Sequence, residues 1–95
     1  MKALSIKSPW AEQIRSGEKT VEYRTWRTSH RGPVLVCCSK KPWSPFAGLA
    51  VCVVDLVDVR FGSDCFEWII RNPRPIDPFP VRGQQGFFEV EFSPQ

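Results

Sequence analysis

The sequence predicts a single small domain over residues 1–95, mainly β with one short helix (α+β), folded as a mostly antiparallel β-barrel. Apolar residues make up 42% of the chain, which is enough for one core in a chain of this length. Nine prolines and six glycines favour many turns over long helices. Five or six short segments have the residue pattern of strands, and a small barrel is a stable way to bury them together.

A strand and a short helix are expected at the beginning of the chain. Residues 3–7 have a strand pattern. Ser8 and Pro9 predict the start of a helix, because serine can cap a helix and proline suits its first position. The helix, expected near residues 9–16, ends at Gly17, since glycine often follows the last helical residue. Two turns are too short to be stable alone, so packing must hold this helix in place.

The four tryptophans are expected to divide between the core and the surface. Trp10 and Ile14 are four residues apart, so they are predicted to share the buried face of the helix. Trp68 lies in an apolar segment and is also predicted to be in the core. Trp26 is the best candidate for stacking against a ligand, whereas Trp43 is expected in a loop.

The later strands follow from apolar and alternating segments. The longest, residues 48–60, is apolar on both faces in its first half, which predicts a central strand. Asp55 and Asp58 break this pattern and predict a bulge or the end of the buried part. Residues 66–70 fit a strand or a helical turn, and the proline-rich residues 72–83 fit an extended edge or a wrapping loop. Further strands are predicted at residues 20–26, 33–39 and 86–92.

Composition and spacing argue against several classes of protein. The net charge of +3 is modest for a protein that binds nucleic acid mainly by charge. The four cysteines include no C-x-x-C pair, and Cys37 and Cys38 would point to opposite faces of a strand. We therefore expect buried thiols in a reducing compartment, with no disulfide, no metal and no cofactor. The chain shows no membrane-span or signal-peptide pattern, which predicts a cytoplasmic protein. The sequence does not determine the oligomeric state, for which a monomer is favoured.

The segment GEKTVEYRTW, residues 17–26, concentrates polar and aromatic side chains. In a strand, Glu22, Arg24 and Trp26 share one face, where the carboxylate and the guanidinium can pair. Lys19 can join them only from the turn before the strand, where alternation does not apply. Such a cluster beside an indole suits a planar ligand with a phosphate or acyl oxygen, such as a nucleotide. The alternative is a solvated strand face with an ordinary ion pair.

Residues 4–40 resemble the ASCH (activating signal cointegrator homology) domain, whose hallmark G-x-K-x-x-E-x-R follows a short helix. Gly17, Lys19, Glu22 and Arg24 match this hallmark in order and spacing. The resemblance extends over nearly the whole chain, because further segments also look like the family: Pro9-Trp10-Ala11, Arg31-Gly32, Trp68 and residues 80–90.

The resemblance implies a PUA-like β-barrel with the hallmark at a cleft beside the helix. The PUA relatives are mostly RNA-binding modules, and ASCH domains are associated with RNA or RNA-linked regulation. Some small ASCH proteins are hydrolases, either amidohydrolases of acylated cytidines or ribonucleases. In the amidohydrolase branch, the third residue after the hallmark lysine is a threonine proposed as the nucleophile. This chain has Glu22 there, the commoner form in the family, so that mechanism does not transfer directly.

Other basic residues are candidates for the same site. Lys7 precedes the helix and can reach an anion bound near its start. Arg82 begins the segment R-G-Q-Q-G, where glycine permits close backbone approach and arginine can bind phosphate with two nitrogens. Lys40, Lys41 and Trp43 form a loop that can contact a nucleic-acid backbone. For each of these segments, a solvated turn is the alternative.

Two classes of function follow from these residues. A binding module would hold RNA or a nucleotide, with positive charge from Lys19, Arg24 and Arg82, stacking on Trp26, and Glu22 as an acceptor. A small hydrolase of modified nucleosides or RNA would use Lys19 as a base and Glu22 as a proton relay. A third alternative is a protein-interaction role. A closed pocket of nucleoside size favours the hydrolase, and an open groove that reaches the lysine pair favours polymer binding.

Overall fold

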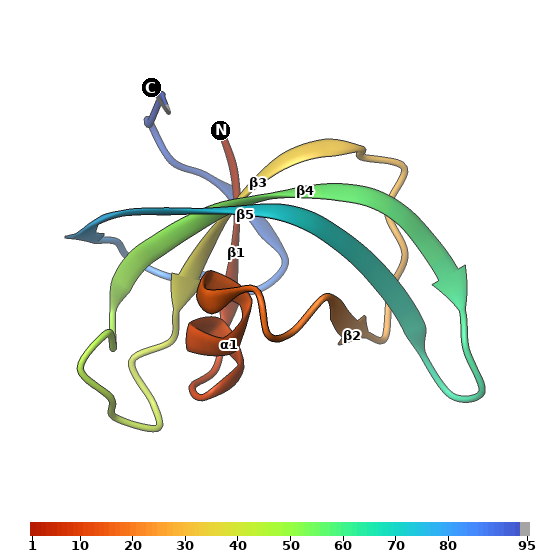
Figure 1. Cartoon of the computed structure of the whole chain (residues 1–95), viewed down its shortest axis with the longest axis horizontal. Helices are drawn as coiled ribbons and strands as arrows, with labels where there is room; N and C mark the ends of the chain where they lie inside the picture. The colour runs from red at the N-terminus through yellow and green to blue at the C-terminus, as the bar shows by residue number, and fades with distance from the viewer. Residues whose placement is uncertain (94–95) are drawn as a thin grey trace.

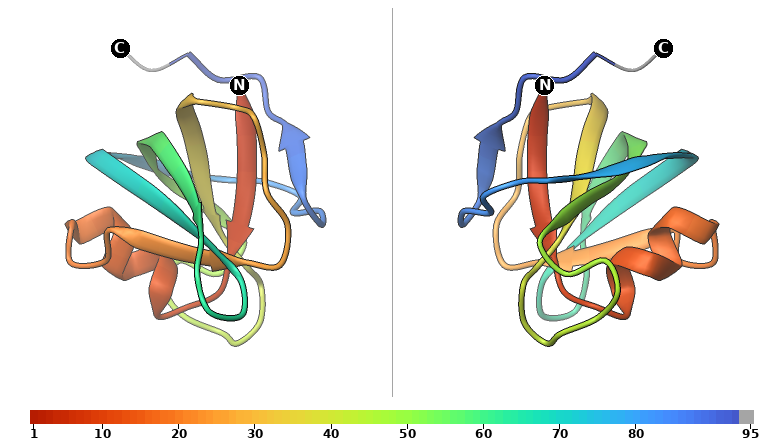
Figure 2. Two further views of the ribbon diagram at one scale, coloured as in Figure 1. Left: turned by 90° about the vertical axis from the view of Figure 1, so that its right-hand side faces the viewer. Right: turned by 90° about the vertical axis from the view of Figure 1, so that its left-hand side faces the viewer.

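The computed structural model describes residues 1–93, in which six strands form one curled sheet around one short helix (Figures 1 and 2). The sheet order is β2-β5-β4-β3-β1-β6. Only β1 and β3 run parallel, so the expected mainly β, mostly antiparallel fold is confirmed as a half-barrel with β2 and β6 at its edges. The elements are β1 (Lys2–Ile6), α1 (Trp10–Ser16), β2 (Val21–Arg24), β3 (Gly32–Cys38), β4 (Leu49–Phe61), β5 (Phe66–Pro80) and β6 (Phe87–Glu89).

The long β4–β5 hairpin contains residues 66–70 and most of residues 72–83, the two segments for which the sequence allowed more than one structure. Residues 66–70 form a strand, and β5 continues as an extended strand to Pro80. β2 pairs only with Phe66–Ile69, so the proline-rich part of β5 is a free edge on that side, as its lack of N–H donors requires. The register of β4 against β5 shifts before Asp55 and before Asp58, where the sequence predicted a bulge or the end of the buried part. A further shift between Ala50 and Cys52 was not predicted.

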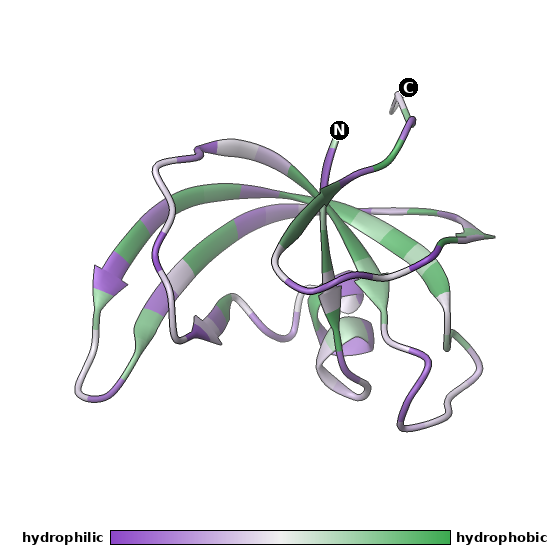
Figure 3. Ribbon diagram, turned by 180° about the vertical axis from the view of Figure 1, so that it is seen from behind, coloured by the Kyte–Doolittle hydropathy of each residue, from purple (hydrophilic) through white to green (hydrophobic). Residues whose placement is uncertain are grey.

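Hydrophobic residues are concentrated in the central parts of the strands and are buried on both faces of the sheet (Figure 3). On the concave face, α1 packs against the sheet through Ala11 and Ile14 beside the buried Trp68. Cys38 belongs to this cluster, whereas Cys37 belongs to the cluster on the convex face, so the predicted alternation is confirmed. The convex cluster is covered by residues from the two ends of the chain, from late β5 and from the position just after it: Met1, Ile76, Phe79, Val81, Val90 and Phe92.

The helix turns a different face to the sheet from the expected one. Trp10 is 48% exposed, while Ala11 and Ile14 are almost fully buried. Alanine has no side chain beyond Cβ, so it lets the helix approach the sheet closely, and this rotation leaves the indole of the first helical residue outside. The prediction that Trp10 belongs to the core was therefore wrong.

The two ends of α1 differ in how well the sequence predicted them. Pro9 occupies the position before the helix, and no side chain caps it. Ser8 instead donates its hydroxyl hydrogen bond to Glu12 Oε2 at 2.7 Å, so the predicted serine cap was wrong. Gly17 ends the helix with φ 86°, in the left-handed region that glycine adopts without strain, and that prediction is confirmed.

The cysteines are free thiols, three of them buried. Burial raises the pKa of Cys37 and of Cys52 to about 12, so both are protonated at neutral pH. Within residues 1–93, no group of three histidine, cysteine or carboxylate side chains is arranged to hold a metal ion. No helix in this range combines the length and the apolar character needed to cross a membrane.

Candidate functional site

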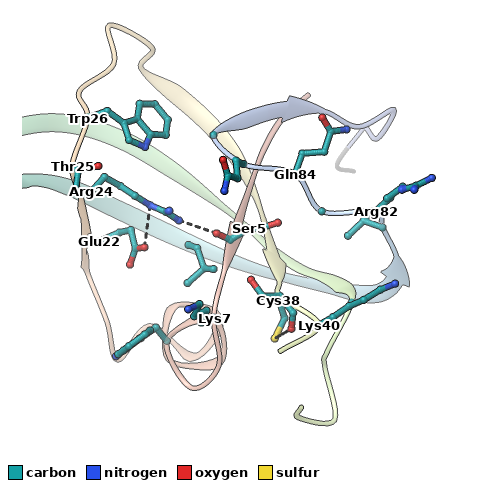
Figure 4. Close-up of a pocket in the computed structure, with 18 residues that line it drawn as sticks. Ser5, Lys7, Glu22, Arg24, Thr25, Trp26, Cys38, Lys40, Arg82 and Gln84 are labelled. Carbon is teal, nitrogen blue, oxygen red and sulfur yellow. Dashed lines mark hydrogen bonds and ion pairs between the residues drawn. The ribbon is translucent and has the colours of Figure 1, made fainter. Parts of the chain in front are cut away.

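A cleft of about 910 Å³ opens beside the start of α1, between the ends of β1, β2 and β3 and the loop of residues 81–86 (Figure 4). Glu22, Arg24 and Trp26 form one wall, and Lys40 and Arg82 lie on the other side, with Ser5 between them. The volume is near the upper end of the ~300–1,000 Å³ typical of small-molecule sites. Segments far apart in the sequence thus create a space large enough for more than one nucleotide-sized group.

Arg24 is held in a defined orientation at the centre of this wall. Its Nη2 donates a hydrogen bond to the Ser5 carbonyl oxygen at 2.8 Å. Its Nε lies 3.3 Å from Glu22 Oε2, close enough for an ion pair but without the alignment of a hydrogen bond. The Glu22 side chain is 12% exposed and that of Arg24 22%. Glu22 and Arg24 therefore share one face of β2, as alternation predicts, and the pair is largely shielded from water. The predicted strand over residues 20–26 ends earlier, so Trp26 lines the same wall from beyond the end of β2.

Lys19 belongs to the same polar cluster but does not line the cleft. Its backbone N–H donates to the Gln13 carbonyl oxygen at 3.0 Å, which places Lys19 in the turn after α1. Its Nζ lies 3.6 Å from Glu22 Oε1 and 5.0 Å from the centre of the Tyr23 ring. Neither Lys19 nor Tyr23 is among the residues that line the cleft. Lys19 therefore contacts Glu22, which lines the cleft, but does not line the cleft itself. Direct contact between Lys19 and a ligand stays a prediction.

Trp26 forms a rigid part of the wall. Its ring packs edge-on against Trp68 at 4.7 Å and against Phe87 at 5.4 Å between centroids. Trp68 Nε1–H also donates to the Trp26 carbonyl oxygen at 3.2 Å. The indole is half-buried and also lines the cleft, so it is held by the core in a fixed position where a ligand can contact it.

The remaining candidates differ in their relation to the cleft. Lys7 and Arg82 line it and are exposed, although the Arg82 side chain extends away from Glu22 in Figure 4. A Cβ on Gly83 would lie 2.6 Å from Ser5 Oγ, so glycine permits the 81–86 loop to pass close to β1. Arg31 lies instead beside a separate pocket of about 360 Å³. No pattern in the sequence points to the Ser5 carbonyl, because every residue has one.

Burial raises the pKa of Glu22 above its ordinary value of 4.5, and the nearby charges of Arg24 and Lys19 only partly oppose this effect. Removal from water disfavours the ionised carboxylate, whereas the two cations favour it. The folded protein thus holds a proton on Glu22 more tightly than the unfolded chain does. This contribution to stability is present at low pH and is lost as the pH rises through the raised pKa.

The Glu22→Gln variant should reveal this titration. We expect the unfolding free energy of the wild type, measured relative to that of Glu22→Gln, to fall as the pH rises from about 4 to about 7. Chemical denaturation at each pH measures the difference, and the other carboxylates cancel because both proteins contain them. A difference that stays constant or grows over this range would contradict the raised pKa.

Comparisons with known proteins agree with this architecture. The model of the ASCH domain family matches residues 4–83. Over 42 residues the chain is 43% identical to human activating signal cointegrator 1, a stretch that is 44% of this chain but only 7% of that protein.

The fold is similar to that of an ASCH protein from Zymomonas mobilis. The crystal structure superposes with a TM-score of 0.76 at 14% identity, covering 95% of this chain and 87% of the other. A point mutant of the same protein gives a TM-score of 0.75 at 15% identity, covering 95% and 89%. At these identities the likeness concerns the half-barrel fold and not the chemistry of the cleft.

Proposed function

The chain belongs to the ASCH domain family, and from this premise we propose that its cleft binds RNA, with one nucleotide held against the wall that Trp26 and the Glu22–Arg24 pair form. The observation that carries the proposal is the combination of this shielded ion pair and a fixed indole on one wall with exposed cations around the rest of the cleft.

The ion pair and the indole suit different parts of one nucleotide. The half-buried ring of Trp26 offers a surface for any base, because every base has a π face. The Glu22 carboxylate can accept a hydrogen bond from an exocyclic amine. Arg24 uses Nη2 for Ser5, and its Nη1 has no hydrogen-bond partner among residues 1–93. This nitrogen is available for a phosphate oxygen, and the arginine loses little freedom on binding because it is already fixed.

The shape of the cleft favours a polymer over an isolated nucleoside. Its lining continues from Glu22 and Arg24 to Lys40 on the far side, with Lys7 and Arg82 exposed around it. Exposed lysine and arginine side chains are typical phosphate contacts and make binding dependent on salt. An open cleft with cations at several points fits successive phosphates of a strand.

Hydrolysis of a modified nucleoside or of RNA is the second candidate, and the raised pKa of Glu22 favours it. A carboxyl group with a raised pKa on the wall of a cleft is suited to transfer a proton. In this mechanism Glu22 contacts the reacting atoms, and Lys19 positions it from behind.

Two substitutions separate the candidates and test the proposal. We expect Lys19→Ala to weaken RNA binding about tenfold, or ~1.4 kcal/mol, because Glu22 loses one of its two cations. In a binding module, Glu22→Gln changes affinity modestly, and no turnover exists to be lost. In a hydrolase, Glu22→Gln keeps affinity but lowers turnover ~100-fold or more. Affinity and product formation would be measured with short RNAs and modified nucleosides. If both variants match the wild type on every compound it recognises, the cluster takes no part in binding or turnover.

A further inference from the structure

Trp43 is the most exposed large hydrophobic side chain among residues 1–93, at 79%. Keeping an indole in water forgoes the favourable burial of a large apolar surface. A single exposed aromatic is not unusual by itself, so its significance depends on how the surrounding chain holds it and on what lies beside it.

The loop that carries Trp43, residues 39–48, is held in place by contacts just after Trp43 and at its end. The next residue, Ser44, is buried, with its Oγ 3.6 Å from Cys38 Sγ. The Phe46 N–H donates to Ser44 Oγ at 3.2 Å, and the Gly48 N–H donates to the Cys38 carbonyl oxygen at 2.9 Å. Phe46 itself packs against the core. Because its neighbour is fixed in this way, Trp43 is displayed at a defined place on the surface.

The charges of this loop link the indole to the cleft. Lys40 lines the cleft, Lys41 is exposed, and Trp43 follows two residues later. The loop contains no acidic residue. Figures 1 and 2 place it at the same end of the molecule as the start of α1, where the cleft opens. Two lysines therefore lie along the chain between the cleft and an exposed aromatic ring. Proteins that bind single-stranded nucleic acids combine positive charge and aromatic side chains in this way.

We propose that the 39–48 loop is a second contact surface for single-stranded RNA, on which Trp43 stacks a base of the strand that leaves the cleft. The inference rests on the proposed function of the cleft and extends it from one nucleotide to a strand. Lys40 and Lys41 contact the phosphates between the two stacking positions. Single-stranded RNA is the occupant because stacking needs an unpaired base, and the loop supplies positive charge without the fixed hydrogen-bond pattern that would read a particular sequence.

The test compares two lengths of RNA. In the full 95-residue chain, Trp43→Ala should weaken binding of an octauridylate roughly 5- to 150-fold, the range for loss of one stacked base, and leave binding of the dinucleotide UpU unchanged. Trp43→Phe retains an aromatic face and should keep most of the affinity. Lys41→Gln should lower the slope of log affinity against log salt for the octamer by about 0.7, because one phosphate contact is lost.

Phe61→Ala is the matched control, since Phe61 is 70% exposed at the end of β4 and does not line the cleft. It should bind both RNAs like the wild type. If Trp43→Ala binds the octamer as tightly as the wild type, or loses affinity for both RNAs equally, or is matched by Phe61→Ala, the inference is overturned while binding of UpU still supports the cleft. If the wild type binds neither RNA, the proposed function itself fails.

Discussion

Arg24→Ala is expected to weaken RNA binding at least ~30-fold, about 2 kcal/mol or more. Arg24 is the cation at the centre of the cleft wall, where Ser5 and Glu22 hold it in place before any ligand arrives. Its removal takes away the preorganised phosphate contact and also leaves Glu22 without the nearer of its two cations. The remaining carboxylate then repels the phosphates of the ligand. Fluorescence anisotropy with a labelled short RNA would measure the loss.

Two controls separate the position of Arg24 from its charge. Arg24→Lys keeps the charge but loses the planar group that contacts Ser5 and Glu22 together, so it should recover only part of the affinity. Arg27→Ala removes an exposed arginine from the same segment outside the cleft and should lower affinity only slightly. Equal losses in Arg24→Ala and Arg27→Ala would mean that general positive charge, and not the cleft, attracts the RNA.

Trp68→Ala is expected to lower the unfolding free energy by about 3–5 kcal/mol, a large part of the ~5–15 kcal/mol typical of a small domain. Trp68 is 1% exposed and packs against both Trp26 and Phe87, with ring centroids 4.7 Å and 5.5 Å away. Truncation leaves a cavity under the cleft wall and removes the hydrogen bond to the Trp26 carbonyl oxygen. Chemical denaturation followed by far-UV circular dichroism would measure the change.

The conservative variant Trp68→Phe should be destabilised less, because it keeps an aromatic ring and loses the indole N–H and part of the volume. A loss below ~1 kcal/mol in Trp68→Ala would contradict the role of Trp68 as the centre of the concave core. Arg24→Ala removes one partner of a shielded ion pair and the hydrogen bond to Ser5, so it should also lower the unfolding free energy, but by less than Trp68→Ala. Binding and unfolding are therefore measured for both variants.

The sequence by itself determined the features that depend on local backbone geometry. Gly17 ends the helix because only glycine enters the left-handed region without strain. Alternation along a strand places Glu22 and Arg24 on one wall and sends Cys37 and Cys38 to opposite faces. Each of these inferences requires only neighbouring residues and a known repeat. The ASCH hallmark likewise indicated the family, because its spacing is a local pattern.

Only the tertiary structure decided which residues from distant segments meet. The Ser5 carbonyl holds Arg24 from nineteen positions away, and Lys19 meets Glu22 outside the lining of the cleft. The small side chain of Ala11 sets the rotation of α1 and leaves Trp10 exposed. These outcomes depend on how closely two elements approach and in which register, and backbone groups common to every residue take part in them. Side-chain type and spacing along the chain therefore do not predict such contacts, and only the three-dimensional structure shows them.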